Sequence, residues 1–268
     1  MGLAIGDLFS VRNKNIIITG GASGIGYTIA ETMVTNGANV TLMDRDEAGM
    51  AAAAQAFASL SKQEVTCAAF DLSDPVAAAD SVDRAIKRMG RIDAIFVNAG
   101  VSAGPGYGSP TGAIEAVDIG LWDSSMRINL TGAMFTIQAA ARHMKAQRSG
   151  SIIVTTSVAS MTTSPLPGYA YHAAKAGLAH VMRLAANELV SFGVRVNGIA
   201  PGGFPTNMAG GRLKEKDAGA LFAATAPMNR LGRMEEIAGP ALLFASDAST
   251  FMTGVNLPVD GGVAAAAT

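Results

Sequence analysis

The segment from Asn15 to Met43 constrains the fold of this chain more than any other. It begins with a short apolar, β-branched run at 15–19, N-I-I-I-T, which leads directly into the turn G-G-A-S-G-I-G at 20–26. Apolar residues then recur at helical spacing up to the stop signal Asn36-Gly37, and 38–43 has the pattern of a second strand. A strand, a helix and a strand within about 30 residues predict one β-α-β unit of a parallel sheet.

The glycines of this turn have the spacing that a bound pyrophosphate requires. They follow the pattern G-x-x-x-G-x-G, in which Gly20 permits a tight turn. Gly24 and Gly26 let a pyrophosphate approach backbone N–H groups at the start of the helix. Turns also collect glycine for steric reasons alone, but the flanking strands and helix favour a nucleotide site.

An acidic residue follows at the end of the second strand. Asp44 lies 20 residues after Gly24, where a dinucleotide site places the acid that binds the adenosine ribose hydroxyls. A carboxylate there repels a 2′-phosphate, so we expect NAD rather than NADP as the cofactor. Two alternatives stay open: Arg45 could receive that phosphate, and an acid at a strand end can simply be solvated.

Strands and helices alternate through the rest of the chain. We expect strands at 65–70, 92–97, 151–156, 194–200 and 254–259, and helices at 46–60, 74–89, 121–145, 171–192 and 234–244. This order predicts one α/β domain over 1–268, a doubly wound parallel sheet of about seven strands in a three-layer α/β/α arrangement. Parallel strands end at one edge, so the glycine turn, Asp44, Asp71, Asn98 and Ser157 are expected to meet there.

Two segments depart from this regular alternation. Asn129 lies inside the helix expected at 121–145, where its amide competes for backbone hydrogen bonds; it marks either a local distortion or a solvated position. The segment 207–226 is irregular and charged, and is expected to be either a mobile lid over a pocket or a loosely ordered surface loop.

Tyr171 and Lys175 are candidates for proton transfer. Residues four apart share one face of a helix, so the ammonium of Lys175 favours the phenolate form of Tyr171. The pKa of tyrosine is about 10, so a role near neutrality needs several kcal/mol from neighbouring charge. A lysine alone is insufficient, and a cationic cofactor would supply the rest. By chance, many helices also carry a Tyr and a Lys four apart.

The composition narrows the kinds of partner. The formal net charge is -1 with 15% charged residues, which excludes the basic surface typical of nucleic-acid or anionic-membrane binding. We see no apolar run of the roughly 18 residues that a membrane span needs, and expect a cytoplasmic protein. Cys67 is the single cysteine and His occurs three times, so we expect no metal site. The hydrophobic fraction of 49% suggests that apolar surface is buried against other copies of the chain.

Taken together, these motifs resemble the classical short-chain dehydrogenase/reductase family, a Rossmann-type fold, over approximately residues 9–263. The resemblance implies cofactor contacts at the glycine turn, at the strand ends and after the sixth strand. The residues concerned are Gly20, Ser23, Gly24, Ile25, Gly26, Asp44, Arg45, Asp71, Leu72, Asn98, Ala99, Gly100, Tyr171, Lys175, Pro201, Gly202, Phe204 and Thr206.

The resemblance also implies a catalytic tetrad of Asn129, Ser157, Tyr171 and Lys175. Tyr171 would be the general acid/base and Ser157 would hydrogen-bond the substrate oxygen. Lys175 would bind the nicotinamide ribose and lower the Tyr171 pKa, and the backbone of Asn129 would hold a water in a proton relay. The Ser157–Tyr171 spacing is one residue longer than the commonest form of the family, which leaves Ser160 as an alternative for the serine.

The expected function is NAD-dependent interconversion of a secondary alcohol and a ketone, on a small or cyclic, largely apolar substrate. A polyol, a sugar acid or a 3-oxoacyl substrate stays open, since Arg212, Lys214 and Lys216 could reach the pocket from the lid. The segment between Asn98 and Asn129 is longer than expected for the family and should alter one wall of the pocket. A non-catalytic NAD(H)-binding sensor is the alternative of another class, and the family resemblance implies a homotetramer.

Overall fold

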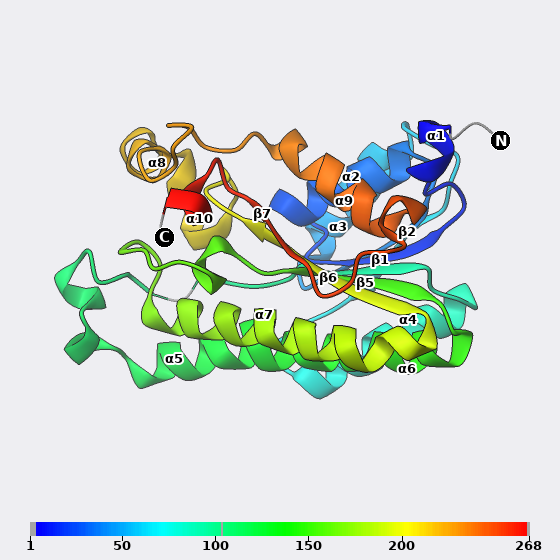
Figure 1. Cartoon of the computed structure of the whole chain (residues 1–268), viewed down its shortest axis with the longest axis horizontal. Coiled ribbons are helices and arrows are strands. Elements are labelled where there is room, and N and C mark those ends of the chain that lie inside the picture. The colour runs from blue at the N-terminus through cyan, green and yellow to red at the C-terminus, as the bar shows by residue number, and fades with distance from the viewer. Residues whose placement is uncertain (1–3, 103, 267–268) are drawn as a thin grey trace.

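The fold is a seven-stranded, wholly parallel sheet with helices on both faces, as the sequence predicts (Figure 1). The structure is a computed structural model that describes residues 4–102 and 104–266. The strand order is β3-β2-β1-β4-β5-β6-β7. The strands are β1 Asn15–Thr19, β2 Asn39–Asp44, β3 Val65–Ala69, β4 Ala94–Val97, β5 Gly150–Thr155, β6 Val194–Pro201 and β7 Asn256–Val259.

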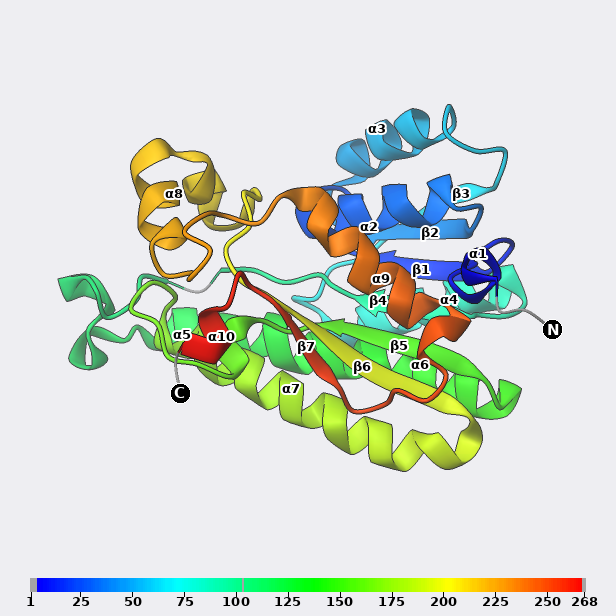
Figure 2. The same cartoon turned by 45° about the horizontal axis from the view of Figure 1, so that its top comes forward.

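Helices form two layers around this sheet. Helices α2, α3 and α9 cover one face, and α4, α6 and α7 cover the other (Figures 1 and 2). The helices are α1 Ile5–Leu8, α2 Gly24–Thr35, α3 Glu47–Phe57, α4 Pro75–Met89, α5 Ile119–Met126, α6 Ala133–Gln147, α7 Tyr169–Leu189, α8 Lys216–Ala223, α9 Ala238–Ala245 and α10 Val263–Ala266.

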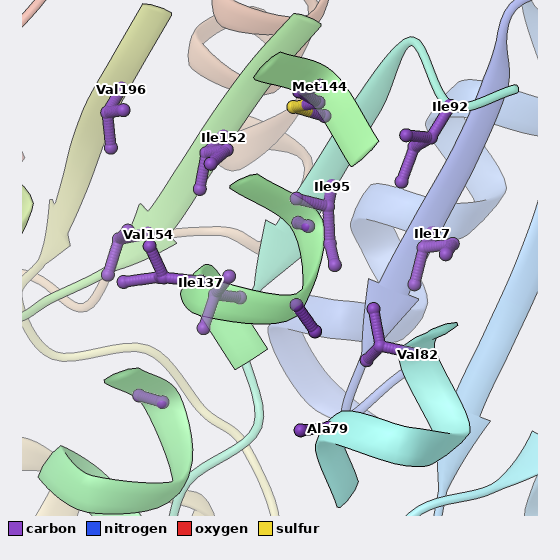
Figure 3. Packing of buried hydrophobic residues seen from close by; sticks show 14 of the residues in the cluster. Ile17, Ala79, Val82, Ile92, Ile95, Ile137, Met144, Ile152, Val154 and Val196 are labelled. Atoms are coloured by element: carbon purple, nitrogen blue, oxygen red, sulfur yellow. The ribbon is translucent and has the colours of Figure 1, made fainter. Parts of the chain in front are cut away.

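Each face of the sheet has its own hydrophobic core. Successive strand residues point to opposite faces, so Ile17 packs with α4, α6 and α7 while Ile16 and Ile18 pack with α2, α3 and α9. Figure 3 shows the first core, where Ile17 and Ile152 from two strands lie over side chains of α4 and α6. Strands that are apolar on both faces are typical of a parallel sheet covered on both sides.

The helix ends follow from local capping. Asp74 caps α4 by accepting a hydrogen bond from Ala77 N at 3.1 Å, and Pro75 occupies the first turn. Gly90 ends the same helix in the left-handed region, with φ +75°. The predicted start and end of this helix are confirmed.

The helix expected at 121–145 is not continuous. α5 and α6 are joined by a π-helical turn, Arg127–Gly132, and Asn129 lies in this turn with 1% of its surface exposed. The prediction that Asn129 marks a local distortion of the helix is therefore confirmed, and the alternative of a solvated position is wrong. The segment 207–226 is also more regular than expected, because it forms a 3₁₀ stretch, Met208–Lys214, followed by α8.

Candidate active site

The carboxyl ends of the strands bring the predicted cofactor residues to one edge of the sheet. The glycine turn follows β1, and Gly20 N donates a hydrogen bond to Met43 O at 2.7 Å, which ties the turn to β2. Gly24 has φ +57°, and a Cβ there would lie 3.3 Å from Thr206 Cβ, in the loop after β6. The loops after β1 and β6 therefore touch, although 182 residues separate Gly24 and Thr206 in the chain.

The start of α2 has free N–H groups beside this turn. Ser23 is the N-cap residue, and no described side chain caps the helix. The first backbone N–H groups of a helix have no partner inside it and favour an anion. At Gly26, a Cβ would lie within 2.6 Å of the Asn98 amide, so a side chain at this position would close the turn. Ile25 is partly buried between these glycines.

Asp44 and Asp71 mark the ends of two neighbouring strands. Asp44 is partly buried and accepts hydrogen bonds at 3.1 Å from Ala22 N in the glycine turn and from Asp46 N. A hydrogen bond from Ser73 N at 2.8 Å holds the pKa of the Asp71 carboxyl below its usual range, with a smaller contribution from the charge of Arg45. Arg45 itself is exposed. Leu72, beside Asp71, is buried, with 5% of its surface exposed.

Asn98 connects three strands beneath the glycine turn. Its Nδ2 donates to Thr19 O at 3.1 Å, and its Oδ1 accepts from Thr155 Oγ1 at 3.0 Å. Thr19 Oγ1 accepts from the backbone N–H groups of Asn98 and Ala99. Thr19 and Thr155 are buried, so the network links β1, β4 and β5 away from solvent at this edge of the sheet.

The side-chain amide of Asn129 binds the backbone of the segment that follows Gly100. Its Oδ1 accepts from Val101 N at 2.9 Å, and its Nδ2 donates to Val101 O at 3.0 Å and to Ser125 Oγ at 3.1 Å. Every polar atom of the buried amide is thus paired. A Cβ at Gly100 would lie 2.8 Å from Asn129 Oδ1 and 3.7 Å from Lys175 Nζ, so this glycine allows the two side chains to approach the strand.

Ser157, Tyr171 and Lys175 lie together at the end of β5. Burial raises the pKa of the Tyr171 phenol, and a hydrogen bond with Ser157 opposes that rise. Lys175 is 3% exposed; its Nζ donates to Thr155 O at 2.9 Å and lies 5.8 Å from the centroid of the Tyr171 ring. Burial lowers the pKa of the Lys175 ammonium to about 8. Lowering of the Tyr171 pKa by Lys175 and the cofactor stays a prediction.

These residues fit a nicotinamide dinucleotide. The glycine turn lies at the uncapped start of α2, which suits a pyrophosphate, and Asp44 offers a carboxylate that suits ribose hydroxyls. The buried ammonium of Lys175 has three donor positions, and one of them binds Thr155 O. Ribose hydroxyls are acceptors that suit the others.

The structure changes the interpretation of two predicted residues, Ser160 and Phe204. Ser160 Oγ donates to Ser157 O at 2.6 Å, so its hydroxyl supports Ser157 and is a poor replacement for it. Phe204 is 4% exposed and packs in the core against Gly232, so its ring is not presented to a cofactor; Thr206 is partly exposed. The side chain of Arg212 lies outside the described part of the chain.

The sequence interpretation missed Thr19, Thr155 and Val101, which hold Asn98, Lys175 and Asn129. Thr19 is the last residue of the strand predicted at 15–19, and Thr155 is the last but one of the strand predicted at 151–156; each lies next to a motif, which is a usable signal. Val101 bonds through its backbone alone, and no sequence pattern reports such a contact.

β6 ends at Pro201, and Gly202 follows it beside the last strand. Gly202 N donates to Val259 O at 3.0 Å, and a Cβ at this glycine would lie 2.9 Å from Asp260 Cα. The loop that carries Thr206 thus leaves the sheet at a fixed point.

Nucleotide-binding features and a proton-transfer group meet at one edge of this sheet, which is the arrangement of a dinucleotide-dependent oxidoreductase. The chain matches the family model described as enoyl-(acyl carrier protein) reductase over residues 20–264. It belongs to the classical short-chain dehydrogenase/reductase family. Members of this family bind a nicotinamide cofactor and act on CH–OH donors, and exchange between alcohol and ketone fits the relatives.

Two curated relatives span nearly the whole chain. Sorbose reductase sou1 of Schizosaccharomyces pombe is 33% identical over 264 residues, covering 96% of this chain and 98% of that protein. The cis-4-hydroxycyclohexanecarboxylate dehydrogenase of Sinomonas cyclohexanicum is 34% identical over 261 residues, covering 97% and 100%.

Solved structures agree with this relationship. Levodione reductase has a TM-score of 0.88 at 30% identity, covering 95% of this chain and 99% of that one. The Pseudomonas aeruginosa RhlG/NADP active-site complex has a TM-score of 0.87 at 32% identity, covering 96% and 99%.

Two further observations concern only residues 4–102 and 104–266. Within them, no group of three or more His, Cys, Asp or Glu side chains is arranged to hold a metal ion. None of the helices there combines the length and apolarity that a bilayer span requires.

Proposed function

We propose that the protein is an NAD-dependent oxidoreductase that interconverts a secondary alcohol and a ketone. The observation that carries this proposal is the cluster at the end of β5, in which Lys175 is 3% exposed, with its Nζ 5.8 Å from the centroid of the Tyr171 ring, and Ser157 lowers the pKa of the same phenol. A phenol in this position can take the carbinol proton or return it to a ketone.

Each residue of the cluster has a distinct task in the proposal. Tyr171 Oη exchanges the proton with the substrate oxygen, and Ser157 Oγ holds that oxygen in place. Lys175 binds the nicotinamide ribose, and its charge stabilises the phenolate. Asn129 holds the backbone of Val101, in the segment that follows Gly100. When bound, the nicotinamide accepts or supplies the hydride.

The cofactor is proposed to extend along the edge of the sheet. Its adenosine ribose would lie at Asp44, its adenine beside Asp71 and Leu72, its pyrophosphate at the start of α2, and its nicotinamide near Thr206 and Lys175. The supporting contacts would come from Gly20, Ser23, Gly24, Ile25, Gly26, Arg45, Asn98, Ala99, Gly100, Pro201 and Gly202.

Replacing Tyr171 by Phe tests the proposed reaction. The variant keeps the ring and loses the hydroxyl, so we expect turnover to fall by about 10²–10⁴-fold with NADH affinity retained. Steady-state kinetics and NADH fluorescence titration provide the two measurements. A variant that binds NADH normally and keeps most of its turnover would refute a role for the phenol in proton transfer.

Asp44 supports the preference for NAD. Its carboxylate accepts two backbone hydrogen bonds, which fix its position at the place where a 2′-phosphate would lie. Arg45 is exposed next to it and supports the alternative, as does the NADP complex of the related Pseudomonas structure.

We therefore expect Asp44→Ala to improve the use of NADP relative to NAD by about tenfold, which corresponds to roughly 1.4 kcal/mol of removed repulsion. The kcat/KM ratio for the two cofactors measures it, with Asp46→Ala as the control because Asp46 caps α3. Equal affinity of the wild-type protein for NAD and NADP would contradict the premise.

For the substrate, we propose a small or cyclic, largely apolar alcohol or ketone. The hydroxycyclohexanecarboxylate dehydrogenase acts on a ring compound by its name, which supports a cyclic substrate. Sorbose reductase supports the alternative of a polyol or sugar, and exposed Lys214 and Lys216 would suit an acidic one. NAD reduction measured across alcohols of graded size and polarity separates these classes, and no reduction with any of them would favour a binding protein instead.

A further inference from the structure

A chain of hydrogen bonds connects the last strand of the sheet to the turn that carries Ser157. Asn256, in β7, donates from Nδ2 to Ser160 Oγ at 3.2 Å. Its Oδ1 accepts from Thr156 Oγ1 at 2.6 Å. One side chain therefore holds the residue before Ser157 and the third residue after it.

Ser160 completes this connection. Its Oγ donates to Ser157 O at 2.6 Å, and its backbone N donates to the same oxygen at 2.9 Å. The Ser157 hydroxyl oxygen in turn accepts from Ala159 N at 3.2 Å. The direction of the Ser157 hydroxyl is thus set inside a short turn that Asn256 fastens from β7.

The neighbouring strand makes room for this amide. Gly198 is the register partner of Asn256 in the β6–β7 pair, and a Cβ at Gly198 would lie 2.6 Å from Asn256 Oδ1. Glycine weakens a strand interior and often marks a close approach of another group. Here the approaching group is the Asn256 amide, so the sheet is adapted to hold it.

We propose that Asn256 is a positioning residue that, through Ser160 and Thr156, fixes the turn that aims the Ser157 hydroxyl at Tyr171. The inference rests on the proposed function, in which Ser157 and Tyr171 act on the substrate oxygen. Asn256 acts through the turn and its hydrogen bonds do not reach the reacting atoms.

Two variants break this connection at different points, and two others serve as controls. Asn256→Leu replaces the amide by a side chain of similar size and so removes both of its hydrogen bonds. Ser160→Ala removes the hydroxyl that connects Asn256 to Ser157 O. Ser160→Thr keeps the hydroxyl. Thr253→Val is the matched control, because the Thr253 hydroxyl also ties this part of the chain to β6, accepting from Val196 N at 3.1 Å, but does not bond to the Ser157 turn.

For Asn256→Leu and Ser160→Ala we expect kcat to fall about tenfold while the NADH dissociation constant stays within about twofold. The double variant should be no worse than Ser160→Ala, because both changes interrupt the same path. Ser160→Thr should retain the rate, and Thr253→Val should leave kcat unchanged. Loss of the Ser157 hydrogen bond removes an influence that lowers the Tyr171 pKa, so the rising limb of kcat for alcohol oxidation should move to higher pH.

A second measurement does not depend on activity. Ultraviolet titration of tyrosinate, taken as the difference from Tyr171→Phe, follows the Tyr171 phenol directly. Asn256→Leu and Ser160→Ala should move this titration to higher pH, in the same direction as Ser157→Ala. Lys175 is the charged group beside the phenol, and none of these substitutions alters it.

The two measurements separate the possible failures. An unchanged Tyr171 titration with wild-type kcat and only a lower melting temperature would reduce Asn256 to a structural role, and additive losses in the double variant would also overturn the proposal. A wild-type protein without NAD(H)-dependent turnover, but with the expected titration shifts, would contradict the proposed reaction and leave the positioning role supported. If Asn256→Leu does not fold, the kcat and the Tyr171 titration of Ser160→Ala test the proposal instead.

Discussion

Among single residues, Lys175 destabilises the folded state, because its charged ammonium is buried. Its ammonium is 3% exposed and burial lowers its pKa to about 8, from 10.5 for a free side chain. The unfolded chain therefore binds a proton more tightly than the folded chain. The penalty is fully present below about pH 8 and fades as the pH rises from about 8 to 10.5.

We therefore expect Lys175→Met to stabilise the cofactor-free protein at pH 7 while abolishing turnover. A pKa lowered by this amount corresponds to a loss of roughly 3 kcal/mol in the free energy of unfolding, which the substitution would remove. The substitution also removes the hydrogen bond to Thr155 O, which costs about 1 kcal/mol of that gain. Denaturant unfolding from pH 7 to pH 10 measures the gain, which should shrink as the pH rises. Exposed Lys87→Met is the control; a Lys175→Met protein that is less stable at pH 7 would contradict the expectation.

Among the elements, the segment at 207–226 is proposed to close over the pocket. Thr206, at its start, lies against Gly24 of the proposed cofactor site. Figures 1 and 2 show α8 and the segment 104–118 at the same end of the molecule, on the left in both views. A cofactor in contact with Thr206 would therefore restrict the segment that begins there.

Limited proteolysis tests this proposal, because Lys214 and Lys216 are exposed trypsin sites within the segment. We expect NADH to slow cleavage at these two lysines severalfold. Lys62 is an exposed site in the turn between α3 and β3, and its cleavage should not respond to NADH. Equal cleavage of the segment with and without NADH would show that the cofactor does not order it.

The elements also show how far the sequence predicts this molecule. Helix ends depend on nearby residues, and the helix predicted at 74–89 agrees with the observed α4 at both ends. Asn129 predicts a distortion of the long helix, but its contact with Val101 depends on a residue 28 positions away. Local patterns can report the first kind of feature and not the second.

The same distinction applies to the candidate site. Asp44, Tyr171 and Lys175 are identifiable from a strand end and from a four-residue spacing, both of which are local. The bond from Thr156 to Asn256 joins residues 100 positions apart, and it exists because the strand order places β7 beside β6. Ser160 is a candidate catalytic serine by sequence alone, and its supporting role is visible only when that order is known.

For the whole molecule, the prediction of a homotetramer stays open and can be measured. Ile119 on α5, Met134 on α6 and Leu184 on α7 are exposed apolar side chains, and at Leu184 the exposed fraction is 58%. Apolar surface of this kind is typical of contacts between copies of a chain.

We expect sedimentation velocity to give a tetramer at micromolar concentration, and Leu184→Glu to shift the protein to smaller species. Val76 is a comparably exposed residue of α4, so Val76→Glu serves as the control. A wild-type monomer would refute the prediction.

The strand order also has a consequence for biosynthesis. β7 is the last of the seven strands to leave the ribosome, and it pairs with β6 at the edge of the sheet. The first six strands can assemble, and can offer a nucleotide the turn after β1, before Asn256 arrives to fasten the turn at Ser157. If the proposals above hold, a nascent chain of this protein would acquire the proposed cofactor site first and the proposed alignment of Ser157 last.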